Sequence, residues 1–110
     1  MADFMKLLQQ AKEMQERMQR MKDELKAKSV TGAAGGGMVT VEADGTGAVR
    51  RVRIDPSTLA GGDVEMLEDL VLVAVTDAQK KAQALAEDEM KGMAAGLGLP
   101  NLPGGFKLPF

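Results

Sequence analysis

The sequence predicts a small α+β fold in which a long N-terminal helix precedes an antiparallel sheet of about three strands and a C-terminal helix. Three observations predict it. Residues 3–28 contain no Gly or Pro, residues 29–55 alternate around Gly-rich turns, and residues 63–90 return to a helical apolar pattern. We therefore expect one dimerising domain over residues 1–91, followed by a flexible tail rich in Gly, Pro and Leu over residues 92–110.

The first helix, over residues 3–28, carries a narrow apolar seam whose spacings alternate between 3 and 4 residues. A seam of period 3.5 fits a partner helix better than a broad core. Its members are Phe4, Leu7, Ala11, Met14, Met18, Met21 and Leu25. Self-association is the simplest use of this seam, and an adaptor coiled coil or a Met-rich groove for client peptides are alternatives. Glu13, Glu16 and Glu24 each precede a basic residue by four positions, which predicts supporting ion pairs.

The sheet is predicted from a strand at residues 38–43, a turn at residues 44–47 and a returning strand at residues 48–54. A four-residue loop would set Val39 opposite Val52 and Ala43 opposite Ala48, with a bulge near Arg50. The expected inner face holds Val39, Val41, Val52 and Ile54. The Gly-rich segment 32–37 lacks the ending of a phosphate-binding loop. It is expected to be a bend between helix and sheet, or a close backbone contact at a symmetry axis.

The second helix is expected to begin near Asp63, a suitable N-cap, and to end at about Met90. Its inner stripe is Leu67, Leu70, Val71, Ala74, Ala78, Ala82 and Leu85. Leu72, Val73 and Val75 are also apolar, which indicates burial on more than one side. One side can be the sheet, and a twin subunit is the simplest candidate for the other. The residues expected in a dimer or partner seam are Leu7, Met14, Met18, Met21, Val71 and Val75.

The composition disfavours catalysis, because the chain has no His and no Cys, and none of its hydroxyls lies in a nucleophile motif. The acidic clusters at residues 65–69 and 87–89 are expected to be solvated faces, so no metal is predicted. We expect no cofactor and no small-molecule substrate. The longest apolar run, Leu70 to Val75, is too short to span a bilayer, so the expected location is cytoplasmic and no membrane partner is expected.

Basic residues carry the leading functional hypothesis. The net charge is −2, but residues 1–28 hold seven basic and five acidic side chains. Cations at suitable spacing contact a phosphate backbone without reading sequence. The candidate DNA-binding residues are Lys6, Lys12, Arg17, Arg20, Lys22 and Lys26 on the helix, with Arg51 and Arg53 on the open strand face. A protein-interaction module without nucleic acid, and RNA binding by shape, remain alternatives.

Several segments, taken in their order along the chain, resemble the YbaB/EbfC family of bacterial nucleoid-associated proteins. They are the Met/Gln-rich helix from Met5 to Lys28, the Gly-rich residues 33–37, the hairpin Val39 to Ile54 leading into Asp55-Pro56, the block from Asp63 to Ala78, and residues 96–100. The resemblance implies a tweezer-like homodimer with protruding helices. It further implies a protein of the nucleoid that binds double-stranded DNA, alters its conformation and contributes to nucleoid organisation and gene regulation.

Overall fold

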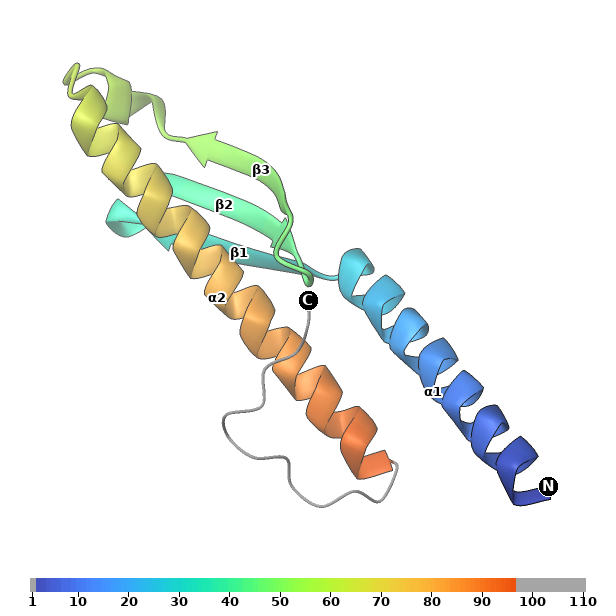
Figure 1. Ribbon diagram of the computed structural model, residues 1–110. Coiled ribbons are helices and arrows are strands. Elements are labelled where there is room, and N and C mark those ends of the chain that lie inside the picture. Colours follow the sequence, from blue (N-terminus) through green and yellow to red (C-terminus); the bar gives the residue numbers. More distant parts are fainter. Residues whose placement is uncertain (1, 97–110) are drawn as a thin grey trace.

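The computed structural model describes residues 2–96 of the 110-residue chain as an elongated α+β molecule of 71 × 24 × 18 Å (Figure 1). Its helices and strands are α1 (Ala2–Ala27), β1 (Ser29–Ala34), β2 (Val39–Asp44), β3 (Val49–Ile54) and α2 (Val64–Gly96). Short 3₁₀ turns cover Gly35–Gly37 and Pro56–Leu59. The predicted order of helix, three-stranded antiparallel sheet and helix is confirmed.

The second helix is longer than its sequence predicts. Asp63 caps it as expected, because its Oδ1 accepts a hydrogen bond of 3.0 Å from the Met66 amide. The helix then continues past Met90 to Gly96, so residues 92–96 are helical and were wrongly assigned to the tail. Met and Ala at residues 93–95 favour helix, and Met93 packs against the cluster that joins the two helices. Residues 97–110 of the expected tail lie outside the described residues.

The β2–β3 register differs from the predicted one by two residues. Val39 faces Ile54 and Val41 faces Val52, although Val52 was expected opposite Val39. The first residue of this shift arises at the turn. Asp44 was expected in the turn but belongs to β2, where its amide donates to the Ala48 carbonyl at 2.9 Å. The second residue of the shift arises from the predicted bulge at Arg50, because Glu42 faces Arg51 while Ala43 faces Val49. A shift of two preserves the face on which each side chain lies.

The sheet core lies between α2 and the first two strands. We call the buried residues of this layer the sheet core: Ala34, Val39, Val41, Ala43, Ala74 and Ala78. At Gly32 a Cβ would lie 2.3 Å from the Ala74 carbonyl oxygen, so the strand touches the helix backbone to backbone. The Gly-rich segment therefore supplies a close contact with α2, and its remaining glycines turn the chain from β1 to β2. The expected bend between helix and sheet was wrong, because β1 precedes the turn, and the alternative of a contact at a symmetry axis stays a prediction.

The third strand is left uncovered by α2, which packs over β1 and β2 (Figure 1). Val52 and Val49 lie opposite the buried Val41 and Ala43, so they occupy the α2 side of the sheet. Nevertheless they are 44% and 41% exposed. The predicted burial of Val52 is therefore wrong within this chain, because a single helix covers only two strands.

The first helix is an arm that projects from the sheet beside the second half of α2 (Figure 1). Only Lys28 separates α1 from β1, so the arm begins directly at the sheet edge. We call the buried residues Met21, Leu25, Ala86 and Met90 the arm junction. Part of the predicted seam thus has its partner within the same chain, while Phe4 and Leu7 remain 62% and 64% exposed.

Candidate nucleic-acid interface

The six helix cations predicted to bind DNA are all exposed on the arm. Among residues 2–96 none of them forms an ion pair, and neither do Arg51 and Arg53. The ion pairs expected along α1 from Glu13, Glu16 and Glu24 are also absent from that part of the chain. Lys28 instead pairs with Glu89 of α2, which ties the base of the arm to the second helix. Unpaired, exposed cations are free to contact phosphates.

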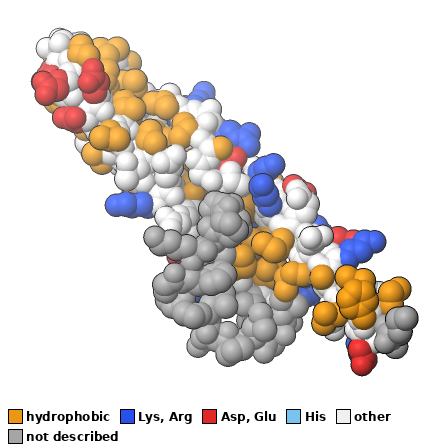
Figure 2. All heavy atoms as spheres, in the orientation of Figure 1, with side chains coloured by type: hydrophobic (Ala, Val, Ile, Leu, Met, Phe, Trp, Pro, Cys, Tyr) orange, Lys and Arg blue, Asp and Glu red, His pale blue; other side chains and the backbone are white. Residues whose placement is uncertain are grey.

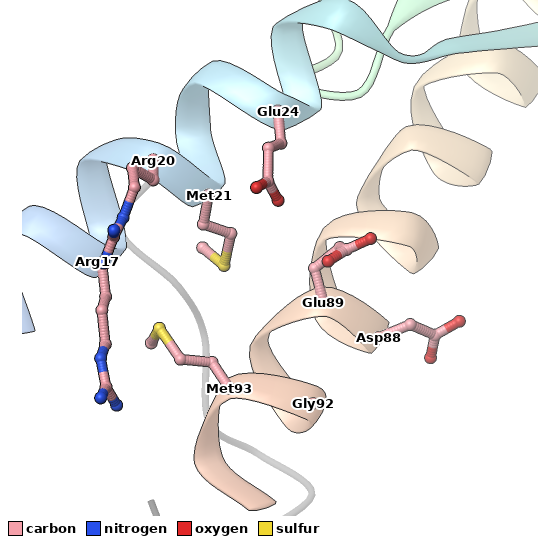
Figure 3. A pocket seen from close by; sticks show the side chains of 8 residues that line it. All are labelled: Arg17, Arg20, Met21, Glu24, Asp88, Glu89, Gly92 and Met93. Carbon is pink, nitrogen blue, oxygen red and sulfur yellow. The ribbon is translucent and has the colours of Figure 1, made fainter. Parts of the chain in front are cut away.

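The arm cations have different surroundings. A hollow of about 380 Å³ separates the arm from the end of α2, with Arg17 and Arg20 on one wall and Asp88 and Glu89 on the other (Figure 3). Met21 and Met93 point toward each other across it. Lys22 and Lys26 do not line this hollow, and their spacing of four places them on one face of α1. Lys22 and Lys26 therefore form an exposed cationic pair outside the hollow that Asp88 and Glu89 line.

The two strand arginines lie on the open face of the sheet, opposite α2. Arg51 faces Glu42 across the strand pair, and Arg53 faces Thr40. A second hollow of about 200 Å³ lies there, lined by Thr31, Thr40, Val41, Glu42, Arg51 and Arg53. Guanidinium groups and hydroxyls are both good phosphate donors. The open face therefore adds a second cationic surface to the arm.

Asp44 organises the hairpin turn next to the base of the arm, and sequence reasoning missed its role. Its side chain is 3% exposed and accepts hydrogen bonds from the Thr46 hydroxyl and from the Thr46 and Ala48 amides. Arg50 adds an ion pair of 2.8 Å. The Thr46 hydroxyl is the main reason that the pKa of Asp44 lies well below its usual range; burial opposes this shift, and Arg50 and the two amides reinforce it. The Asp-Gly-Thr-Gly turn was the only sequence signal for this arrangement.

Gly45 connects that turn to the arm. Its amide donates to the Leu25 carbonyl at 2.8 Å, and this carbonyl at the end of α1 also accepts from the Lys28 amide at 3.2 Å. A Cβ on Gly45 would lie 2.6 Å from the same oxygen, so only glycine fits this approach. The direction of the arm is therefore set by the hairpin turn on one side and by the arm junction on the other.

The predicted seam residues fall into different environments. Met21 is buried, Met14 and Met18 are half-buried, and Leu7 is exposed. Val71 and Val75 of α2 are half-buried against the sheet core. Within residues 2–96 no cluster of side chains could hold a metal ion, and no helix is long and apolar enough to cross a membrane.

Comparison with known proteins identifies the family of the chain. A sequence model of the YbaB/EbfC DNA-binding family matches residues 1–97. The chain belongs to this family. Among YbaB/EbfC relatives, a nucleoid-associated protein of Gemmatimonas aurantiaca is 44% identical over 98% of this chain and 99% of its own length. Another nucleoid-associated protein, from Xanthomonas euvesicatoria, is 50% identical over 94% and 93%.

A solved structure shares the architecture of this YbaB/EbfC protein. It is that of an uncharacterised protein from Helicobacter pylori, with a TM-score of 0.66 and 26% sequence identity. The match covers 83% of this chain and 91% of the other. The names of the curated relatives associate the family with the bacterial nucleoid.

Proposed function

We propose that this protein binds double-stranded DNA as a homodimer and alters its conformation, thereby contributing to nucleoid organisation and gene regulation in the cytoplasm. The observation that carries the proposal is the arm, whose six exposed cations have no ion-pair partner among residues 2–96. Membership of a DNA-binding family supports the same function. Phosphate contacts from the arms, with Arg51 and Arg53 added, would provide affinity without strong sequence preference.

Dimerisation is supported by apolar side chains on the uncovered strand and on the side of α2 that faces the β2–β3 turn. Gln79 donates to the Gly47 carbonyl at 3.2 Å, so this side of α2 faces the β2–β3 turn. Val75 and Leu72 lie four and seven residues earlier, on the same side of the helix. We call Val49, Val52, Val71, Leu72 and Val75 the β3 flank. Leu72 is 66% exposed, Val49 and Val52 are also exposed, and Val71 and Val75 are half-buried, so burial against a second copy would remove apolar area from water.

A dimer would bring the cations of two arms to one DNA duplex. One copy has a net charge of −2, and the total charge therefore opposes binding to a polyanion. Two copies joined at their β3 flanks would double the number of arm cations in one complex. Because these cations form no ion pairs among residues 2–96, they would attract phosphates locally in spite of the total charge.

The decisive experiment is a duplex-DNA shift assay over a series of salt concentrations, with the mass of the free protein measured in parallel. We compare the wild-type protein with Lys22→Glu/Lys26→Glu. If these lysines each neutralise one phosphate, the dimer loses four contacts, and the slope of log affinity against log salt falls by about 3.6. Affinity should decrease similarly for all duplex sequences, because phosphate contacts do not read bases.

Lys80→Glu/Lys91→Glu is the matched control. Both residues are exposed on α2, and the change in net charge is identical. The control should retain a salt slope close to that of the wild-type protein. An equal decrease of the salt slope in both variants would mean that net charge alone explains the decrease. It would refute the arm as the DNA contact. A wild-type protein with the mass of a single chain would refute the dimer.

A further inference from the structure

The tip of the arm displays large apolar side chains that nothing among residues 2–96 covers. Phe4, Met5, Leu7 and Leu8 are 62%, 67%, 64% and 51% exposed. Figure 2 shows this apolar group at the end of the molecule where α1 begins. Met18 is the most N-terminal residue of α1 that packs against the arm junction. The tip therefore lies beyond the part of the arm that α2 covers.

Two lysines lie among these apolar side chains. Between Asp3 and Glu13 the only charged residues are Lys6 and Lys12. An apolar surface that also carries cations fits a ligand with an anionic exterior and an apolar interior. Duplex DNA has this structure, because its phosphates surround a stack of bases.

We propose that Phe4 and Leu8 form an apolar wedge that enters a base step of duplex DNA while Lys12 holds the adjacent backbone. The inference rests on the proposed function. Spacings of four residues place Phe4, Leu8 and Lys12 in a row along one face of α1. Phe and Leu are among the side chains that separate stacked bases in proteins that bend DNA, typically with kinks of about 20–90°.

The wedge gives a physical means by which the arms change the path of DNA. Contacts to phosphates alone favour binding without requiring a bend. An inserted ring or isobutyl group replaces base–base contact by base–side-chain contact, and the step must open to admit it. With one wedge on each arm of a dimer, two kinks would form at a separation fixed by the distance between the tips. Flexible pyrimidine–purine steps should be preferred sites.

The test uses duplexes that carry 2-aminopurine at successive TA steps and a pair of fluorophores at the ends. Unstacking raises 2-aminopurine fluorescence, and bending raises energy transfer between the ends. The full-length wild-type protein should increase both signals. Phe4→Ala/Leu8→Ala should lose both while keeping its affinity within about threefold, since phosphate contacts supply most of the binding. Leu59→Ala/Val64→Ala removes exposed apolar groups remote from the arm, and it should behave like the wild type.

The outcomes separate the wedge from the proposed function. DNA binding by the wild-type protein with no rise in 2-aminopurine fluorescence at any step would overturn the wedge and leave the function intact. Full unstacking and bending by Phe4→Ala/Leu8→Ala would also overturn it. A shift of that variant from dimer mass to monomer mass would mean that the tips hold a second copy, which refutes the wedge. If the wild-type protein binds no duplex DNA, the proposed function itself fails.

Discussion

The sheet core and the arm junction are built from different side chains. The sheet core uses Val and Ala, and its helix lies so close to β1 that Gly32 is in contact with the backbone of Ala74 and Ala78. The arm junction uses Met21 and Met90, with further methionines partly buried around it. Short and β-branched side chains pack in few ways, whereas Met has three rotatable bonds and a polarisable sulfur. The first contact is therefore rigid and the second adaptable.

The difference matches the different tasks of the two regions. The sheet and the first half of α2 must present the β3 flank in one geometry for a second copy to recognise. The arm must follow a DNA surface whose shape changes as it bends. A Met-lined junction next to an open hollow of about 380 Å³ leaves room for such adjustment. Three substitutions test whether rigidity and adaptability are distributed in this way, beginning with the largest expected effect.

Gly32→Ala should be severely destabilising. The new Cβ would lie 2.3 Å from both the Ala74 oxygen and the Ala78 nitrogen, and neither backbone can yield without moving α2 off the sheet. Overpacking of this kind typically costs 1–3 kcal/mol and occasionally more, and we expect about 3 kcal/mol here. Urea unfolding of both variants at the same protein concentration measures this loss of unfolding free energy. Gly61→Ala is the control, because a Cβ there meets no atom within 4 Å. Equal stability of the two variants would contradict the rigid contact.

Asp44→Asn should be the next most damaging change, because it weakens the turn that supports the arm. The carboxylate accepts from Thr46, Ala48 and Arg50, and loss of these charge-assisted bonds should cost about 2 kcal/mol at pH 7. Unfolding in urea at neutral pH measures the loss. Asp55→Asn, an exposed cap of a single 3₁₀ turn, is a milder comparison.

The same substitution has a signature in pH. The pKa of Asp44 is lower in the folded chain than in the unfolded chain, where it is about 3.9. Its contribution to stability is therefore complete above about pH 4 and is lost as the pH falls through the folded-state pKa. The difference in unfolding free energy between the wild type and Asp44→Asn should shrink as the pH falls below about 4. A difference that stays constant to about pH 2 would show that the charge of Asp44 contributes nothing.

Much of the fold was predictable because its local signals agree with its tertiary structure. The helix of residues 3–28 and the strands around the Gly-rich turns follow from periodicity, and the cap at Asp63 and the bulge at Arg50 follow from local chemistry. The exposed positions of the six arm cations also follow from the helical pattern.

The remaining features depend on neighbours distant in sequence. Gly32 and Gly45 lie against backbone more than 15 residues away, at Ala74 and Leu25 respectively, and no local pattern specifies such contacts. The alternation of apolar and polar residues in β3 predicts that Val52 is buried. It stays exposed because, of the two helices among residues 2–96, only α2 packs over the sheet, and it covers β1 and β2. Which arm cations line the hollow with Asp88 and Glu89 likewise depends on how the two helices lie together.

The smallest expected effect on stability comes from the arm junction itself. Met21→Leu/Met90→Leu conserves volume and should change the unfolding free energy by about 1 kcal/mol or less. It should nevertheless narrow the range of arm positions, because Leu has fewer rotamers than Met. The chain contains no Cys, so spin labels can be placed uniquely at Gln9→Cys and Lys80→Cys. Double electron–electron resonance measures the distance between the two labels, with labelled chains diluted in unlabelled ones. The distribution of this distance should be narrower for the leucine variant. An unchanged distribution would mean that the hairpin turn at Gly45, and not the methionine packing, limits the motion of the arm.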